Sequence, residues 1–166
     1  MSEEMKIAIT LPTNAYFISG IRDFTLNMIK NTTNFPEKWA FRFQSVVDEL
    51  CNNAIEYGSA SGSEIRITFN HIKDQYLEIS VEDTGTGKNK INAAQLQKIF
   101  EDKKQPGYAF TGLRGRGLVK IVGEWTDEIH FADRPQGGII VSVKKFLQDA
   151  RQKIPNEENS QTIIIQ

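Results

Sequence analysis

The sequence has little cysteine and histidine: its 166 residues include one cysteine, Cys51, and two histidines. A single cysteine excludes an internal disulfide and a zinc cluster ligated by thiolates. It is also typical of a protein in a reducing compartment. We therefore expect Cys51 to pack in the core and to take no part in chemistry.

An excess of one charge and a long apolar run are also missing. Lysine and arginine number 20 against 21 acidic residues, so a net charge of −1 provides no basic field for nucleic acid or an anionic membrane. No 18 apolar residues run together, and the charged N-terminus lacks the apolar stretch of a signal peptide. We expect a cytoplasmic protein with no direct contact to nucleic acid or membrane.

The length and composition fit one globular domain. With 39% hydrophobic and 25% charged residues, the chain has enough apolar material for one core. We place this domain at residues 1–151 and expect a polar, mobile tail at 152–166. The apolar triplet 163–165 in that tail can pair with an exposed sheet edge.

Periodicity and turn residues predict the order of helices and strands. Polar and apolar residues alternate over 5–11, which indicates a strand. Apolar steps of three and four from Phe17 to Met28 predict a helix, with Thr13 or Asn14 as its cap. A second helix is expected from Pro36 to Gly58. Further strands are predicted at 64–71, 75–81, 128–132 and 138–145, helices at 91–101, 117–123 and up to 151, and a flexible loop at 102–117.

The second predicted helix holds the first candidate site. Glu49 and Asn53 are four residues apart and therefore lie on one face, beside the apolar stripe. A carboxylate and an amide oxygen placed in this way can serve as a base and a Mg²⁺ ligand. Taken alone, such a pair is more often a solvated helix edge. The stripe that we expect to face the core comprises Trp39, Phe43, Val46, Val47, Leu50 and Ala54.

Two glycine-rich segments follow. Residues 83–87, Asp-Thr-Gly-Thr-Gly, end an isoleucine-rich strand, and residues 112–118 open a predicted helix. Free backbone N–H groups at that helix start, together with Arg114 and Arg116, favour an anion site. Neither segment satisfies the P-loop or the dinucleotide-binding pattern. For each segment a structural turn is the alternative interpretation.

Together and in this order, the three motifs resemble those of the GHKL ATPase superfamily, which contains gyrase, heat-shock chaperones, histidine kinases and mismatch-repair ATPases. The N box corresponds to residues 49–58, the first glycine box to 83–87 and the second to 115–118. The resemblance implies an α/β two-layer sandwich. Its sheet would be mixed but mostly antiparallel, with the helices on one face and ATP held between the helices and a lid.

The resemblance also implies a role for each motif residue. Asp83 would accept a hydrogen bond from the adenine amino group, while Gly85 and Gly87 would let the backbone approach the base and ribose. Asn53 would hold Mg²⁺ against the phosphates of ATP. Glu49 would be the base or orienting group in phosphoryl transfer. The segment expected to bind the phosphate chain comprises Arg114, Gly115, Arg116, Gly117 and Leu118.

Within the superfamily, the chain most resembles the bacterial anti-sigma regulatory factors with serine/threonine-protein kinase activity. The similarity lies in residues 53–58, 114–118, 127–129 and 134–138. The length also favours this branch, because about 35 residues before the N-box helix leave little room for a histidine-bearing hairpin. The resemblance implies a sigma factor and a STAS-type anti-sigma-factor antagonist as partners, and it leaves a homodimer open.

Some residues depart from the pattern of that branch. Tyr57 replaces a histidine that often ends the N box, and Ile139 stands where a threonine is common. The predicted lid helix around 96–101 is more similar to that of histidine kinases. A nucleotide-binding partner switch without kinase activity is therefore an alternative. A structural interaction domain with accidental motifs is a further one.

Overall fold

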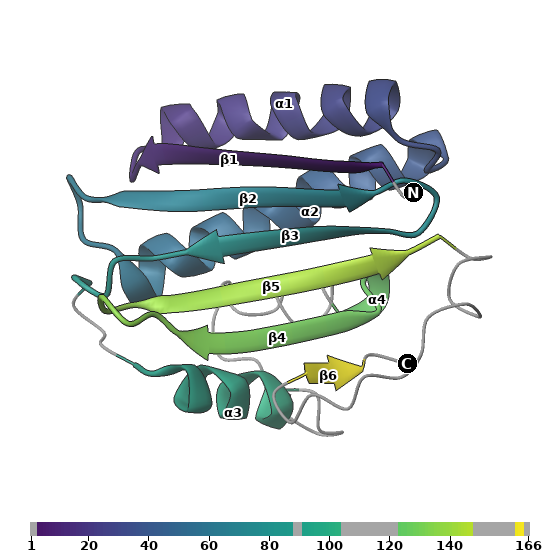
Figure 1. The fold of residues 1–166 in the computed structure, drawn as a ribbon. Coiled ribbons are helices and arrows are strands. Elements are labelled where there is room, and N and C mark those ends of the chain that lie inside the picture. Colours follow the sequence, from purple (N-terminus) through teal and green to yellow (C-terminus); the bar gives the residue numbers. More distant parts are fainter. Residues whose placement is uncertain (1–2, 88–90, 104–122, 148–161, 165–166) are drawn as a thin grey trace.

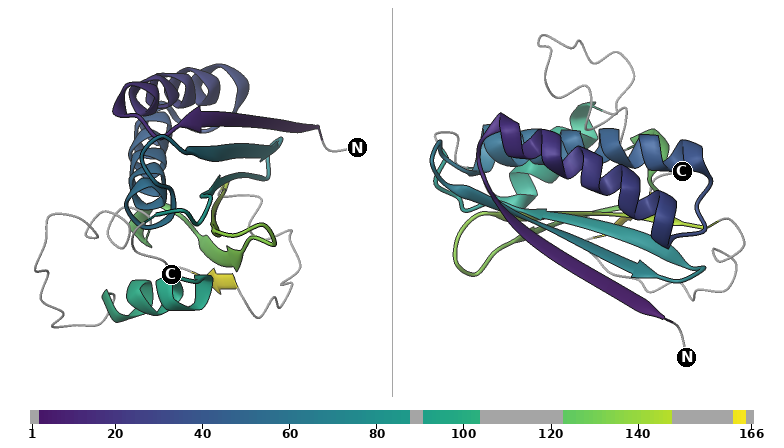
Figure 2. Two further views of the ribbon diagram at one scale, coloured as in Figure 1. Left: turned by 90° about the vertical axis from the view of Figure 1, so that its left-hand side faces the viewer. Right: turned by 90° about the horizontal axis from the view of Figure 1, so that it is seen from above.

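The computed structural model describes residues 3–87, 91–103, 123–147 and 162–164. These residues form two layers, a twisted sheet and a layer of helices (Figure 1). Figure 2 shows that the long helices α1 and α2 cover the same face of the sheet. The expected α/β sandwich with helices on one face is confirmed. No helix in the described part of the chain is long and apolar enough to span a bilayer.

The sheet is antiparallel at every described strand pair. This departs from the expected mixed sheet, because each described strand reverses the direction of its neighbour. Its order is β1-β2-β3-β5-β4-β6. The strands are β1 (Glu4–Pro12), β2 (Glu64–Ile72), β3 (Tyr76–Glu82), β4 (Glu128–Asp133), β5 (Ile139–Phe146) and β6 (Thr162–Ile164).

The short strand β6 pairs with the outer edge of β4, where Ile163 lies opposite Ile129. The apolar triplet near the C-terminus was expected to pair with a sheet edge, and it contributes to a strand on this protein's own sheet. The proposed domain boundary at residue 151 and the tail over 152–161 lie outside the described residues.

The two long helices begin and end close to the predicted positions. Helix α1 (Ala15–Thr32) starts where the Asn14 side chain accepts a hydrogen bond from the Tyr16 nitrogen at 2.9 Å, which is an N-cap. Helix α2 (Glu37–Asn53) follows Pro36 and continues as a π-helical turn, η1 (Ala54–Gly58). The single predicted helix therefore widens directly after Asn53. Such π-helical turns are frequent at functional sites.

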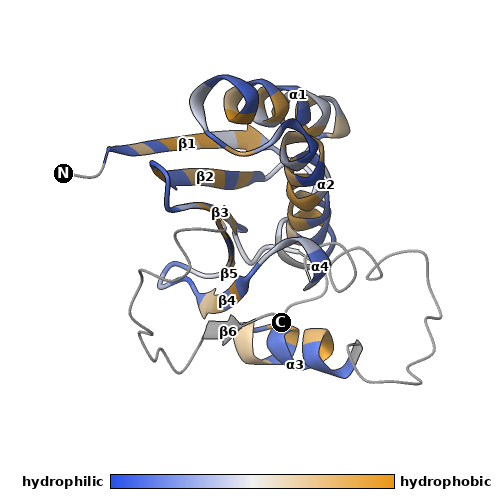
Figure 3. Ribbon diagram, turned by 90° about the vertical axis from the view of Figure 1, so that its right-hand side faces the viewer, coloured by the Kyte–Doolittle hydropathy of each residue, from blue (hydrophilic) through white to orange (hydrophobic). Residues whose placement is uncertain are grey.

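The core lies between α1, α2 and the covered face of the sheet. Figure 3 shows hydrophobic residues recurring along α2 and along the strands that it covers. Trp39 is half-buried at the end of the predicted stripe. The lone Cys51 is buried as expected, and burial raises its pKa to about 12. The remaining stripe residues are buried: Phe43, Val46, Val47, Leu50 and Ala54.

The buried face of α1 differs from the prediction by one residue. Phe17, expected on the core side, is 38% exposed, and the neighbouring Ile18 is buried instead. Thr25 occupies a buried position on the same face because its hydroxyl donates to the Ile21 carbonyl oxygen at 2.7 Å. The core face of α1 therefore includes a buried polar residue that makes a local hydrogen bond, which a pattern based on hydropathy alone does not predict.

Helix α3 (Ala93–Lys103) lies beside β4 and matches the helix predicted at 91–101. It begins with a capping box: Asn92 Oδ1 accepts from the Gln95 nitrogen at 2.8 Å, and Gln95 Oε1 accepts from the Asn92 nitrogen at 2.9 Å. Phe100 is buried against Phe131 of β4. After α3 the described chain resumes at the one-turn helix α4 (Gly123–Trp125). Most of the flexible loop predicted at 102–117, the helix at 117–123 except Gly123, and the helix towards 151 lie outside the described residues.

Candidate functional site

The motif residues that the structure describes come together at one end of the sandwich. The C-terminal ends of α2 and β3 both lie there, next to the start of β5 (Figure 1). Asn53 ends α2, and Asp83 directly follows β3. A hydrogen bond of 3.0 Å from the Thr84 nitrogen to Ser59 Oγ joins the segment after the N box to the first glycine box. The family resemblance implied this juxtaposition.

Asp83 is buried, and one of its carboxylate oxygens is fully occupied. Its Oδ1 accepts hydrogen bonds from the backbone nitrogens of Gly85 at 3.0 Å and Ile139 at 3.2 Å. Its Oδ2 has no hydrogen-bond partner among the described residues. Burial raises the pKa of Asp83, while the two N–H groups and Arg134 act against this rise. The side chain therefore presents one free, oriented acceptor oxygen.

Two glycines allow the loops around Asp83 to meet. Gly85 has a φ of +70°, and a Cβ on it would lie 2.5 Å from the Gly138 nitrogen. Gly138 has a φ of +91°, and a Cβ there would overlap the Asp83 carbonyl oxygen and lie 2.6 Å from Asp83 Oδ1. The absence of a side chain at Gly85 thus allows the backbone of the β4–β5 turn to approach closely. Its expected role beside the base and ribose is an additional one that this contact does not test.

Asn53 carries an unused polar group. The residue is buried, and its Nδ2 has no hydrogen-bond partner in the described part of the chain. Because rotation of the amide exchanges its oxygen and nitrogen ends, one end is left for a ligand whichever way the group is turned. Leaving a buried polar atom unpaired costs about 1 to 3 kcal/mol, which a bound group would recover. This is the observation expected of a residue that holds a metal-phosphate group.

Glu49 lies one turn before Asn53 on α2 and is half-buried. Burial raises the pKa of Glu49, and the adjacent Asp48 raises it further. Asp48 itself is turned towards α1, where its Oδ2 lies 3.2 Å from Arg22 Nε. The two neighbouring carboxylates therefore have different surroundings. A raised pKa brings a carboxylate closer to the range in which it can exchange a proton near neutral pH.

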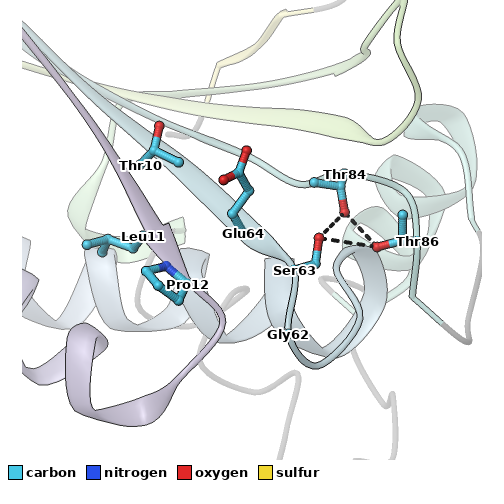
Figure 4. A pocket seen from close by; sticks show the side chains of 8 residues that line it. All are labelled: Thr10, Leu11, Pro12, Gly62, Ser63, Glu64, Thr84 and Thr86. Carbon is cyan, nitrogen blue, oxygen red and sulfur yellow. Dashed lines mark hydrogen bonds between the residues drawn. The ribbon is translucent and has the colours of Figure 1, made fainter.

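A cluster of hydroxyl groups holds the first glycine box in place. Thr84 Oγ1 lies 3.1 Å from Ser59 Oγ, 3.0 Å from Ser63 Oγ and 2.7 Å from Thr86 Oγ1. Figure 4 shows three of these side chains, Ser63, Thr84 and Thr86, at the rim of an open pocket of about 480 Å³. The side chains of Asp83 and Asn53 do not line this pocket. The sequence carried no signal for Ser59 and Ser63, because their partners lie more than 20 residues away.

The turn between β4 and β5 contacts both the Asp83 loop and α3. Arg134 donates from Nη1 to the carbonyl oxygen of Asp83, and its Nε lies 3.7 Å from Glu82 Oε1. Asp133 Oδ1 accepts from the Ala93 nitrogen at 2.8 Å. The sequence pointed to residues 134–138 through the family resemblance alone, and no local pattern indicated that they contact the candidate site.

The predicted phosphate-binding segment is not described. Arg114, Gly115, Arg116, Gly117 and Leu118 all lie outside the described residues. Gly87 is described and buried, at the end of the first glycine box. The described part of the site comprises the residues expected to contact adenine and Mg²⁺. Within that part, Asp83 has one carboxylate oxygen without a hydrogen-bond partner and Asn53 has one unpaired buried amide nitrogen, and both groups fit a nucleotide.

Comparison with known proteins identifies the family of the chain. Residues 40–149 match the family described as histidine kinase-, DNA gyrase B-, and HSP90-like ATPase. The chain belongs to this family of ATPase domains, which implies ATP binding, and Mg²⁺ is usual in such domains.

The chain is similar to the adaptive-response sensory kinase SasA of Prochlorococcus marinus (strain MIT 9215). The two chains are 32% identical over 89 residues, which cover 54% of this chain and 23% of the relative. The chain thus matches less than a quarter of that protein. Family and relative together indicate an ATPase or kinase in general.

Proposed function

We propose that the protein is an ATP-binding anti-sigma regulatory factor with serine/threonine-protein kinase activity. Its substrate is a serine on a STAS-type anti-sigma-factor antagonist, and a sigma factor is the competing partner. The observation that carries the nucleotide part is the buried Asp83 carboxylate: backbone N–H groups hold one oxygen, and the other has no hydrogen-bond partner within the described ranges. The anti-sigma part is supported by the resemblance of residues 53–58, 127–129 and 134–138.

Each described residue has a task in this function. The free oxygen of Asp83 accepts a hydrogen bond from the adenine amino group, which a guanine base does not offer at that position. The unpaired amide of Asn53 holds Mg²⁺ together with the phosphates. Bound Mg²⁺ neutralises charge on the phosphate oxygens. Because nucleotide and substrate must be aligned, most of the rate enhancement comes from positioning.

Glu49 is the proposed base. It accepts the proton of the serine hydroxyl as the new oxygen–phosphorus bond forms and the bond to ADP breaks. Its half-buried position and raised pKa are consistent with this task. The neighbouring Asp48 is paired with Arg22 and faces α1, so it serves as a matched control.

A second candidate is a nucleotide-binding partner switch without kinase activity. The side chain of Ile139 is buried, so this position offers no hydroxyl where the anti-sigma branch commonly has a threonine. Only the backbone nitrogen of Ile139 contacts Asp83. A third candidate is the ATP-binding domain of a histidine kinase, which the match to a sensory kinase favours.

One phosphorylation assay separates the three candidates. The protein is incubated with γ-labelled ATP, Mg²⁺ and candidate antagonist proteins or histidine phosphoacceptor domains. Acid-stable label on an antagonist serine, lost in Glu49→Gln and retained in Asp48→Asn, is expected for the first candidate. Acid-labile label on a histidine domain favours the histidine kinase. Nucleotide binding with no transferred label favours the switch.

A further inference from the structure

An irregularity in the sheet surrounds Asp83. In an antiparallel ladder, two hydrogen-bonded residues that lie opposite each other exchange both of their N–H···O bonds. Asp83 and Ile139 form only half of such a pair: the Asp83 nitrogen donates to the Ile139 carbonyl oxygen at 3.1 Å. The Ile139 nitrogen donates to the Asp83 side chain, at Oδ1, instead of to its carbonyl oxygen. The hydrogen bond that a regular ladder would place on the Asp83 carbonyl oxygen is therefore made to the Asp83 carboxylate.

Arg134 takes the place of the missing ladder donor. Its Nη1 donates to the Asp83 carbonyl oxygen, which the Ile139 nitrogen leaves free. The guanidinium is held at a second point, because its Nε lies 3.7 Å from Glu82 Oε1. Its backbone is also fixed, since the Arg134 nitrogen donates to the Gly138 carbonyl oxygen at 2.9 Å. The Arg134 side chain is 23% exposed and therefore largely shielded from water. A hydrogen bond is stronger in such surroundings than in water.

We propose that Arg134 is a positioning residue for base recognition: by satisfying the Asp83 carbonyl oxygen, it leaves the Ile139 nitrogen free to orient the Asp83 carboxylate towards the adenine amino group. The inference rests on the proposed contact between Asp83 and adenine. Without the guanidinium, the Asp83 carbonyl oxygen becomes available again to the nitrogen of its ladder partner, Ile139. The carboxylate then keeps only the Gly85 nitrogen and loses its fixed direction.

This role differs from simple reinforcement of the β4–β5 turn. If Arg134 only reinforced the turn, its loss would disturb the whole pocket and weaken the binding of every nucleotide alike. If Arg134 orients the Asp83 carboxylate, its loss weakens only the hydrogen bond to the amino group. The two roles therefore separate when ATP is compared with purine riboside triphosphate, which lacks the amino group but keeps the ring, ribose and phosphates.

The experiment measures the affinity of both nucleotides by calorimetry with Mg²⁺ present. For the unaltered protein we expect ATP to bind about 5- to 150-fold more tightly, the range expected when a buried acceptor loses its donor. In Arg134→Ala this ratio should fall towards one, because ATP loses affinity and the amino-free analogue does not. Arg134→Lys keeps a cationic donor and should retain an intermediate ratio.

Arg66→Ala is the matched control. Arg66 also lies beside Glu82, with its Nε 3.9 Å from Glu82 Oε2, but no hydrogen bond or ion pair joins the Arg66 side chain to Asp83 in the described structure. This variant should keep the ratio of the unaltered protein. Thermal unfolding of each variant shows whether it is folded, and Arg134→Lys provides the comparison if Arg134→Ala does not fold.

Two results would overturn the inference and can be told apart. If Arg134→Ala or Arg134→Lys lowers the affinity for both nucleotides equally, the ratio stays unchanged and Arg134 only reinforces the turn. If the unaltered protein shows no preference for ATP over the analogue, the contact between Asp83 and the amino group is wrong, and the proposed nucleotide recognition fails with it.

Discussion

The Oδ1 atom of Asp133, at the end of β4, accepts a hydrogen bond from the backbone nitrogen of Ala93, the first residue of α3, at 2.8 Å. A negative side chain at a helix N-terminus also interacts favourably with the helix dipole. The next residue, Arg134, reaches the Asp83 loop. Two adjacent residues, the last of β4 and the first of the turn that follows it, therefore connect the start of α3 with the proposed adenine site.

We predict that Asp133→Ala destabilises α3 more than Asp133→Asn does. Alanine removes the acceptor for the Ala93 nitrogen, and the loss of such a cap costs about 0.5 to 2 kcal/mol. Asparagine keeps an acceptor oxygen and loses only the charge. Hydrogen exchange of the α3 amides should be faster in the alanine variant, while the amides of α1 are unchanged. Equal protection of α3 in both variants would show that the capping box at Asn92 suffices.

A second prediction concerns Asp83 as the acceptor for the adenine amino group. Asp83→Ala should weaken ATP binding by about 1 to 3 kcal/mol, or roughly 5- to 150-fold, because the amino group loses its partner in a buried site. Asp23→Ala, on the exposed side of α1, is the control. Calorimetry at constant Mg²⁺ measures both. Unchanged affinity in Asp83→Ala would contradict the assignment of the adenine side.

The sequence predicted those parts of the site that local spacing determines. Glu49 and Asn53 stack because a helix repeats every 3.6 residues, and Asp83 sits at the end of a strand that alternation marks clearly. The contact from Arg134 to Asp83 joins residues 51 positions apart. It depends on the register between β3 and β5, which no local pattern determines.

The error on α1 has a different origin. Phe17 and Ile18 are both apolar, and the steps of three and four from Phe17 to Met28 favoured Phe17 as the core residue. The structure buries Ile18, and the next turns of that face include Thr25. A threonine can occupy a buried helical position when its hydroxyl donates to the preceding turn, as Thr25 does to Ile21. A pattern based on hydropathy alone does not detect this case.

A third prediction tests the hydroxyl cluster that anchors the first glycine box. Thr84→Val keeps the shape of the side chain but removes the hydroxyl that contacts Ser59, Ser63 and Thr86. We expect a loss of about 1 kcal/mol in the free energy of unfolding, since the buried Ser59 and the part-buried Ser63 each lose a hydrogen-bond partner. Chemical denaturation measures the loss. Thr68→Val is the control, because the Thr68 hydroxyl has no hydrogen bond among the described residues.

If Thr84→Val and Thr68→Val have the same stability, the cluster contributes nothing measurable. A stability loss in Thr84→Val accompanied by weaker ATP binding would indicate that the cluster also supports the position of Asp83, the preceding residue.

The last prediction concerns pH. His71 on β2 is buried on the core side of the sheet, and its Nε2 has no hydrogen-bond partner among the residues that the structure describes. Burial lowers the pKa of His71 below its ordinary value of 6.5, and Asp74 opposes this only in part. At pH values between the folded and unfolded pKa, the unfolded chain binds a proton that the folded protein does not. The contribution of neutral His71 to the free energy of unfolding should therefore be fully present above pH 6.5. It should decrease as the pH falls through 6.5 towards the lower pKa of the folded state.

Replacing His71 by phenylalanine removes the titrating group and keeps a ring in the core. The difference in unfolding free energy between the two proteins should change between pH 7.5 and pH 5.5, with the unaltered protein losing more stability on acidification. Denaturant titrations at several pH values measure this difference and cancel the contribution of other groups that titrate in both proteins. A difference that stays constant over the range would show that His71 binds its proton equally well in the folded and unfolded states.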